Sequence, residues 1–455
     1  MLKVKLKPWA QHFMFHRFLF FVLFIFSSVI LSHPTYTVIV DPGHGGIAKE
    51  PINIHGDKYD SITQTYLEKY KQGTEHGSNT EREIVLALGK EVDQLLKLTE
   101  TEEGFIKFSD HLKKFSNAKK FPRVILKSHL TRTSSFDLDS PMEDTNAPYR
   151  LYDFPNPKTS ERNKGRLSFI NSLKPHLVLS LHLNPAGKGQ VGGMAAVITP
   201  GYSTFKLLKD ISEGKKKAKS FENSPWSDWL VFAGGWSKLE NAMTDAWIYF
   251  HGYWADKSGK KVDLDKFEGY RQNMVTWRYT DKRGWESGSR MNTSGPYAKS
   301  HSGFRPEGIF WERELGKKEI WRREGGREGF GGDNYYATKE LMRFVQFGVR
   351  EQLKKKNGEY PEIGPIQKPY ISTYSLPTYT NAICAFIEIG YINRKRDIKL
   401  LTENRKETAI SLAVGIYSLF VGLELKKPIN MPIFPKGKAV NWERYGKYFE
   451  EAESL

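Results

Sequence analysis

Two histidines and a glutamate in this chain accompany apolar runs, and these residue types are typical of metal and acid–base sites. His44 stands in the run Asp-Pro-Gly-His-Gly-Gly, directly after a β-branched apolar stretch. His182 lies near the end of the apolar residues 177–184, and Glu388 lies inside the apolar residues 385–391. A carboxylate in a buried strand is costly unless it is paired or bound to a metal. The pattern therefore predicts a metal site at the ends of neighbouring strands.

The elements that must position these residues alternate between strand and helix. Apolar or β-branched runs predict strands at 37–41, 123–132, 177–184, 193–199 and 382–392. Amphipathic runs predict helices at 81–98, 163–173, 338–355 and 407–423. This alternation predicts an α/β fold in which helices cover both faces of a sheet.

Three stretches interrupt the alternation. Residues 47–79 are polar and rich in turn residues, and residues 100–120 are charged. The largest interruption, 202–333, holds nine of the 11 tryptophans and is interpreted as an insertion into the sheet domain. Its rings are expected to form a small core of their own, with sugar stacking or partner contacts as the alternative. The predicted division is a first catalytic part at 34–201, the insertion, a second catalytic part at 334–425 and a tail at 426–455.

The N-terminal residues 1–33 have the composition of a targeting segment. Lysines and an arginine precede the apolar run 18–31, and small residues follow it. This order is typical of a secretory signal peptide, and an uncleaved anchor is the alternative. We therefore expect an exported protein of the periplasm or cell envelope.

Bulk composition narrows the possible partners. The chain has 455 residues and a formal net charge of +17, which favours an anionic partner. The basic residues are scattered and no nucleic-acid motif is present, so a nucleic-acid role is not expected. The single cysteine, Cys384, lies in an apolar run and is expected to be a buried small hydrophobe.

Taken in order, these motifs resemble the zinc-dependent N-acetylmuramoyl-L-alanine amidases that open with Asp-Pro-Gly-His-Gly-Gly. In the first part of the chain, that turn is followed by Glu81 at a helix start and by Thr-Arg at a strand end. Arg166 in a helix, Ser-Leu-His-Leu-Asn around His182 and Glu-Ile-Gly-Tyr from Glu388 then follow in the same order as in the family. The resemblance covers roughly 36–46, 77–98, 121–200 and 334–424. It implies a three-layer α/β/α fold with a twisted, mostly parallel sheet, a Zn²⁺ cofactor and a peptidoglycan substrate.

The resemblance also implies a role for each site residue. His44, Glu81 and His182 are the expected zinc ligands, and Glu388 is the expected general base. Arg166 and Asn184 are expected to line or brace the substrate site.

Each role has a structural alternative. His44 could be a turn histidine bonded to the backbone, and His182 a satisfied core histidine. Glu388 could instead form an ion pair with Arg166 or Arg132. Thr80 and Glu83 fit the Ser/Thr-x-x-Glu capping box, which gives Glu83 a structural task and leaves Glu81 free.

Two further histidines, His129 and His176, are expected to be structural. The predicted function is hydrolysis of the amide between N-acetylmuramic acid and L-alanine, with an envelope regulator that contacts the insertion as a candidate partner. The alternatives are a zinc amidohydrolase acting on another acylated peptide or amino sugar, and a non-catalytic cell-wall-binding protein. Stem-peptide specificity and oligomeric state do not follow from the sequence.

Overall fold

The computed structural model describes most of the predicted sheet domain. The described residues are 33–46, 56–60, 65–69, 72–135, 150–151, 154–155, 162–185, 192–199, 201, 203–204, 207, 210, 215–217, 219–222, 320–324, 331–355, 357, 359, 361–371, 376–377, 380–426 and 434–445. The N-terminal segment and nearly all of the tryptophan-rich stretch predicted at 202–333 lie outside them. In the described part of the chain, no helix combines the length and apolar character that a membrane span requires.

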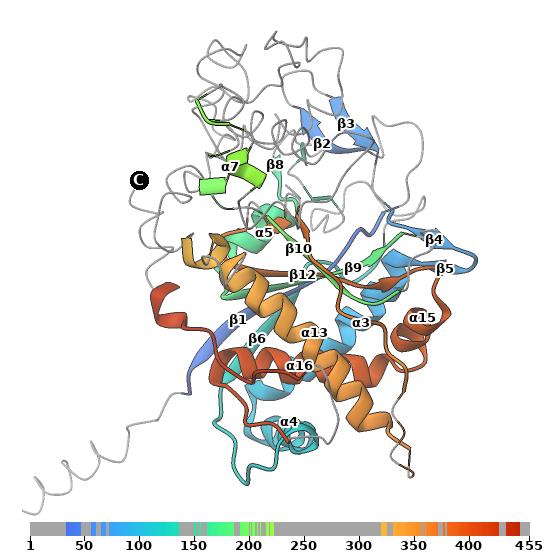
Figure 1. Ribbon diagram of the computed structural model, residues 1–455, viewed down its shortest axis with the longest axis vertical. Helices are drawn as coiled ribbons and strands as arrows, with labels where there is room; N and C mark the ends of the chain where they lie inside the picture. Colours follow the sequence, from blue (N-terminus) through green and yellow to red (C-terminus); the bar gives the residue numbers. More distant parts are fainter. Residues whose placement is uncertain are drawn as a thin grey trace, which may run out of the picture.

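A six-stranded sheet forms the centre of the molecule, with strand order β11-β10-β12-β9-β1-β6 (Figure 1). Its strands are β1 (Thr35–Pro42), β6 (Ile125–Leu130), β9 (Leu177–Asn184), β10 (Ala195–Ile198), β11 (Tyr370–Ile371) and β12 (Ile383–Tyr391). Strands β6, β1, β9 and β12 are mutually parallel, and only the β10–β12 pair is antiparallel. This mostly parallel sheet with flanking helices confirms the predicted α/β class.

Three helices cover one face of the sheet: α3 (Glu81–Lys97), α13 (Gly332–Leu353) and α16 (Arg405–Val421) (Figure 1). Helix α3 packs closely on β1, since a Cβ added at Gly89 would lie 2.8 Å from Pro42 Cγ. Helix α5 (Arg166–Ser172) lies on the other side of the sheet in Figure 1. Strands β9 and β12 are buried almost throughout, which explains their near-continuous apolar sequences.

Shorter elements surround this core. The remaining helices are η1 (Leu98–Glu100), α4 (Glu102–Phe115), α7 (Lys219–Glu222), η5 (Ile320–Glu324), α15 (Lys395–Thr402) and η6 (Trp442–Tyr445). Three small antiparallel pairs are β2 (Gly56–Asp60) with β3 (Thr65–Lys69), β4 (Glu75–His76) with β5 (Asn79–Thr80), and β7 (Phe154–Pro155) with β8 (Arg162–Asn163).

Two local predictions were wrong. The charged stretch 100–120 contains helix α4, whose Phe105, Phe108, Leu112 and Phe115 form a buried stripe beneath its charged face. The helix predicted from residue 163 begins only at Arg166, because residues 162 and 163 pair in strand β8. The other predicted strands and helices of the sheet domain occur with shifted ends, and α13 begins six residues earlier than predicted.

Candidate metal centre and acid–base residue

The sheet brings the predicted site residues together at the carboxyl ends of three adjacent strands. In the parallel register, Asp41 of β1 lies beside Ser180 of β9, and His182 of β9 lies beside Glu388 of β12. Register partners in a parallel pair share one face of the sheet, at a strand spacing of about 4.8 Å. Side chains alternate along a strand, so Ser180, His182 and Glu388 all lie on the face that carries the Asp41 carboxylate. This is the face on which Arg166 of helix α5 contacts Asp41.

The turn after β1 holds His44 against this edge. Gly43 N–H donates to the carbonyl of Leu181 at 2.9 Å, which ties the turn to β9. His44 has a φ of 60°, in the left-handed region that non-glycine residues seldom occupy. Gly43 is required here because a Cβ at this position would lie 2.3–2.6 Å from ring atoms of His182. The glycines of the turn therefore permit the two imidazoles to approach each other.

Glu81 reaches the same point from the first residue of helix α3. Its Oε1 accepts a hydrogen bond from Leu183 N–H at 2.9 Å, and its Oε2 accepts one from Thr74 N–H at 2.8 Å. Burial alone would raise the pKa of Glu81, but the adjacent His44 and His182 rings outweigh it and hold the pKa below its usual range. The buried carboxylate is therefore ionised and fixed in position.

Three potential ligand atoms form a nearly equilateral triangle. The distance from Glu81 Oε1 is 3.1 Å to His44 Nε2 and 3.1 Å to His182 Nδ1, and the two nitrogens are 3.2 Å apart. A hydrogen bond places one proton between two atoms, and each of these nitrogens carries at most one proton. If both imidazole N–H groups donate to the Glu81 carboxylate, no proton remains to form a hydrogen bond between the two nitrogens. Hydrogen bonding therefore leaves one edge of the triangle unsatisfied.

A single cation at the centre of the triangle would satisfy all three atoms at once. Zinc binds imidazole nitrogen and carboxylate oxygen at about 2.0–2.2 Å in tetrahedral sites, which places neighbouring ligand atoms roughly 3.3 Å apart. The observed separations are close to this value, and two histidines with one glutamate leave the fourth position open. Burial lowers the pKa of His182, which keeps its ring neutral and able to donate a lone pair. Among the described residues this is the one group of three or more such side chains that could hold a metal.

Glu388 lies next to the triangle and is not part of it. The side chain is buried, with 8% of the residue exposed, and its Oε2 has no hydrogen-bond partner among the described residues. Burial, and after it the negative charge of Glu81, raise the pKa of Glu388 well above its usual range. Among the described residues, the ion pair of Arg166 is with Asp41, and the alternative of an ion pair between Glu388 and Arg166 or Arg132 finds no support there.

The ring of Phe386 covers one side of the cluster. It lies two residues before Glu388 on β12 and stacks on His182, with ring centroids 4.3 Å apart and planes inclined by 8°. This contact fixes the orientation of the imidazole and puts apolar surface between it and the adjacent strand.

Asp41 is the centre of a buried polar network behind the site. Its Oδ1 accepts hydrogen bonds from Thr131 Oγ1 at 2.7 Å and Arg166 Nη1 at 2.9 Å, and its Oδ2 accepts one from Ser180 Oγ at 2.8 Å. Burial alone would raise the pKa of Asp41, but Arg166 and the hydrogen bond from Thr131 hold it below its usual range. The network joins β1, β9, the end of β6 and helix α5.

Arg132 clamps the histidine turn to the start of helix α3. The guanidinium is buried, its Nε donates to the carbonyl of Pro42 at 2.9 Å, and its Nη2 donates to the carbonyls of Gly43 at 2.9 Å and Arg82 at 2.6 Å. The first two carbonyls belong to the turn that carries His44, and the third follows Glu81. Arg132 is therefore a positioning residue for two of the three triangle side chains.

Arg166 and Asn184, predicted to line the substrate site, both lie close to it. Arg166 is buried against Asp41, and its Nε has no hydrogen-bond partner among the described residues. Asn184 ends β9, and its buried Nδ2 likewise has none. Their contact with substrate stays a prediction.

The remaining sequence candidates lie outside the triangle. His129 is on β6 beside Ile39, and His176 precedes β9 at the opposite end of the sheet. Cys384 is buried and unbridged, and burial raises the pKa of its thiol to about 12. The predicted capping box is absent, since the side chain of Thr80 makes no capping hydrogen bond to α3.

Sequence reasoning did not assign roles to Asp41 and Arg132. A polar residue near the end of β1, within β9 and directly after β6 (Asp41, Ser180 and Thr131) is the signal that could have revealed the network. The contacts of Arg132 go to main-chain carbonyls, which no sequence pattern marks.

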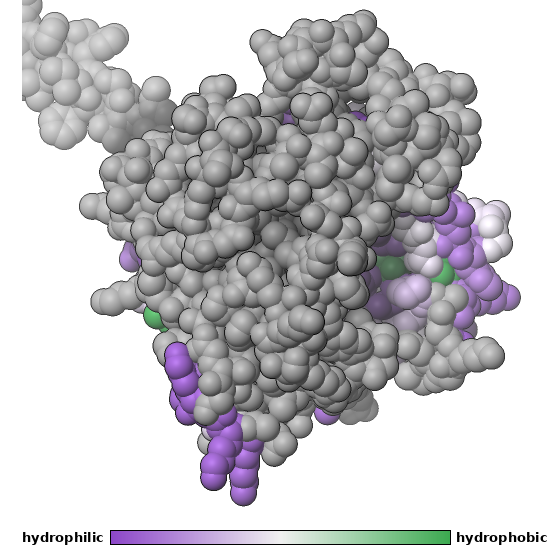
Figure 2. All heavy atoms as spheres, turned by 90° about the horizontal axis from the view of Figure 1, so that it is seen from above, coloured by the Kyte–Doolittle hydropathy of each residue, from purple (hydrophilic) through white to green (hydrophobic). Residues whose placement is uncertain are grey.

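Helix α3 begins at Glu81 directly after β5, so the candidate ligand triangle lies near the β4–β5 pair, which is labelled in Figure 1. From above, described residues are visible at the right of the view, where hydrophilic residues surround a few hydrophobic ones, and at the lower left, where they are hydrophilic (Figure 2).

Comparisons with solved structures find N-acetylmuramoyl-L-alanine amidases. Amidase AmiC2 of Nostoc punctiforme is 10% identical, with a TM-score of 0.30 over 84% of this chain and 94% of that chain. An amidase from Clostridium difficile 630 is 10% identical, with a TM-score of 0.31 over 84% and 96% of the two chains. CwlD from Clostridioides difficile, solved in complex with the GerS lipoprotein, is 14% identical, with a TM-score of 0.31 over 84% and 95%.

The sequence matched no family model and no curated protein. The assignment of function therefore depends on the residues of this chain.

Proposed function

We propose that this chain is a zinc-dependent peptidoglycan amidase that hydrolyses the amide between N-acetylmuramic acid and L-alanine. The observation that carries the proposal is the triangle of His44 Nε2, Glu81 Oε1 and His182 Nδ1 beside the buried carboxyl group of Glu388. The ordered set of motifs supports this substrate class over other amides.

The metal would activate the water and the amide carbonyl, and a side chain of the protein would move the proton. Bound by His44, Glu81 and His182, zinc supplies a Lewis acid and lowers the pKa of water, which favours attack on an amide carbonyl at neutral pH. Glu388 takes a proton from the attacking water and delivers it to the nitrogen of the departing L-alanine. Burial and the negative charge of Glu81 raise the pKa of Glu388, so this carboxyl group holds a proton more strongly than an exposed glutamate does.

Other side chains of the site hold the candidate metal ligands in position. Phe386 fixes the His182 ring, and Arg132 holds the His44 turn against the helix that begins with Glu81. The open Nδ2 donor of Asn184 is suited to a substrate carbonyl, and Arg166 acts chiefly through Asp41.

The setting of the enzyme is part of the proposal. A signal peptide or anchor at 1–33 would take the chain to the periplasm or cell envelope, where its substrate lies. The stretch 202–333 is a candidate contact for an envelope regulator.

The test is digestion of purified peptidoglycan, with products identified by mass spectrometry. We expect new L-alanine amino termini on intact stem peptides, lost with a zinc chelator, restored by zinc, and absent with Glu388→Gln. Glu83→Gln is the matched control, because this exposed glutamate lies on the same helix turn as Glu81 and outside the triangle.

Two results would contradict the proposal. Zinc-dependent release from acylated peptides or amino sugars, with peptidoglycan untouched, would indicate another amidohydrolase of the same chemistry. Wall binding without any new amino termini, in zinc-loaded protein, would indicate a binding protein.

A further inference from the structure

A cavity of about 410 Å³ lies where the parallel strands begin, at the opposite end of the sheet from the metal centre. Tyr36 at the start of β1, His176 just before β9 and Ile383 at the start of β12 line it. At the usual rise of a strand, about 20 Å separate Tyr36 from Pro42 beside the metal centre. The cavity is therefore a separate site, with a volume in the range that binds small molecules.

Aromatic rings that are fixed by packing form one wall of this cavity. Tyr36 and Trp442 both line it, and Phe420 stacks on each of them, with ring centroids 4.3 Å and 4.5 Å away. The Trp442 indole also donates to the carbonyl of Leu419 at 2.8 Å. Rings held in place offer a rigid surface that loses little conformational entropy when a ligand binds.

His176 adds a directed hydrogen-bond donor. Its Nδ1 accepts the main-chain N–H of Thr37 at 3.1 Å, so in the neutral ring the proton resides on Nε2. Burial lowers the pKa of His176, which favours this neutral form. The ring packs edge-on against Tyr36, with centroids 5.1 Å apart. The remaining polar group of the imidazole is therefore an N–H donor in a largely aromatic wall.

Two cationic side chains and one carboxylate are among the groups that line the cavity. Arg322 is buried and donates to the carbonyl of Ala382 at 2.8 Å, Lys174 is exposed, and Glu443 is the exposed carboxylate. Lys174 has a φ of 46°, at the position after helix α5 where glycine is usual. A lysine in this conformation stores backbone strain, and such positions are frequent at binding sites.

We propose that this cavity binds an anionic sugar unit, that is, a sugar ring carrying a carboxylate or a phosphate. The C–H face of the ring would stack on Tyr36 and Trp442, the Nε2–H of His176 would donate to a hydroxyl or acid oxygen, and Lys174 and Arg322 would receive the negative charge. The net charge of +17 assists the approach of such a ligand. The site does not depend on the proposed amidase reaction. It would hold a charged glycan roughly one strand length from the metal centre.

The test is isothermal titration of the full chain with three sugars that differ in charge. N-acetylmuramic acid carries a carboxylate, N-acetylglucosamine 6-phosphate carries a phosphate, and N-acetylglucosamine is neutral. We expect one or both anionic sugars to bind roughly tenfold or more tightly than the neutral sugar, since charge-assisted hydrogen bonds are the stronger kind. The anion that binds identifies the acidic group that the site prefers.

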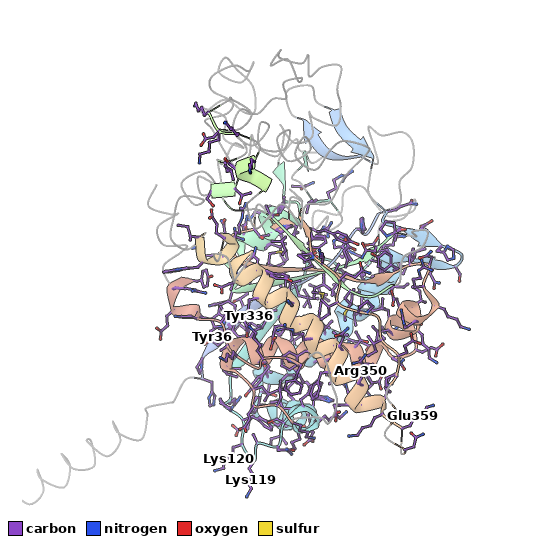
Figure 3. All side chains as sticks on the ribbon, in the orientation of Figure 1. Tyr36, Lys119, Lys120, Tyr336, Arg350 and Glu359 are labelled. Atoms are coloured by element: carbon purple, nitrogen blue, oxygen red, sulfur yellow. The ribbon has the colours of Figure 1, made fainter. Side chains whose placement is uncertain are left out.

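Two variants assign the binding to this cavity. Lys174→Gly removes a cation and relieves the positive φ, so the fold is retained, and the preference for the anionic sugars should fall severalfold. His176→Asn keeps an acceptor for Thr37 N–H but removes the Nε2 donor, and it should weaken the binding of all three sugars. Lys119→Gly is the control: it removes an exposed, non-helical lysine at the far tip beyond α4, whereas Tyr36 lies on the side where β1 begins (Figure 3).

Equal affinity for neutral and anionic sugars would overturn the proposal, as would anion binding that both variants leave unchanged. Because Glu388→Gln lies at the other end of the sheet, it should abolish hydrolysis and leave this binding intact. Failure of the amidase proposal and failure of the sugar site are therefore distinguishable.

Discussion

Replacement of Arg132 by lysine tests whether the metal centre depends on the clamp between the histidine turn and helix α3. Arg132 donates to the carbonyls of Pro42, Gly43 and Arg82 from two nitrogens of one rigid plane. Lysine keeps the charge but has a single compact head on a flexible stem, so it cannot reproduce this fork. We expect Arg132→Lys to let the turn that carries His44 move relative to Glu81.

The geometry gives the size of the effect. A hydrogen bond from a charged donor contributes about 1.5–3 kcal/mol, so losing two of the three gives a destabilisation on the order of 3–6 kcal/mol. Groups that orient metal ligands commonly change metal affinity by 10–100-fold. A hundredfold loss corresponds to about 2.7 kcal/mol less stabilisation by saturating zinc.

The assay is zinc affinity by competition with a chromophoric chelator, combined with denaturant unfolding with and without zinc. Arg123→Lys is the control, because within the described part of the chain the ion pair of Arg123 is with Glu102, whose side chain is exposed. We expect the zinc-free Arg132→Lys protein to unfold at lower denaturant and to gain less stability from zinc than the parent.

One result would refute this reasoning. If Arg132→Lys lost stability in the zinc-free state but bound zinc within twofold of the parent, Arg132 would be a structural residue with no influence on the ligands.

Three further predictions concern the site. Glu388→Gln should keep zinc affinity within severalfold but lower the rate of hydrolysis by about 10²–10⁴-fold in a peptidoglycan digest, because it removes the proton carrier; retained activity would exclude Glu388 as the base. Gly43→Ala should displace the His182 ring, which lies 2.3–2.6 Å from the added Cβ, and should weaken zinc binding measured by chelator competition; unchanged affinity would mean that the turn adjusts freely. Asp41→Asn should destabilise the fold by about 3–5 kcal/mol, because it leaves the buried Arg166 charge without its partner. The folded-state pKa of Asp41 lies below its ordinary value of 3.8, so its contribution is present above about pH 4 and is lost as the pH falls through the lowered value; unfolding curves from pH 2 to 7 should show this acid loss in the parent and not in the variant.

The sequence predicted that the candidate site residues lie close together where local pattern and sheet geometry act together. The apolar runs of β1, β9 and β12 mark buried parallel strands, and parallel strands present their carboxyl ends at one edge. His182 and Glu388 therefore lie near each other although their sequence numbers differ by 206. The start of α3 at Glu81 was also predicted.

The reason given for that helix start was wrong. Thr80 does not cap the helix, and Glu81 is held instead by the main-chain N–H groups of Thr74 and Leu183. Leu183 lies on a strand that the chain reaches 102 residues later, so no local pattern could indicate this contact. For the same reason the clamp by Arg132 was not predicted.

Helix α4 was missed because charge dominated the interpretation of residues 100–120. Phe105, Phe108, Leu112 and Phe115 recur at helical spacing and face the core, while the lysines and glutamates between them cover the outer face. Thr101 caps this helix by accepting a hydrogen bond from Gly104 N–H at 3.0 Å. Apolar periodicity was the more informative signal here.

The position of β12 in the sheet has a consequence for how the protein is made. The three triangle residues all precede position 200, but β12, which carries Glu388, enters between β9 and β10 only when the chain has passed residue 380. Until then, β9 and β10 each present an unpaired edge, which favours wrong pairing with other chains. A nascent chain stopped before β12 would hold all three candidate ligands and no proton carrier. Any metal binding by such a chain would therefore precede any activity that needs Glu388.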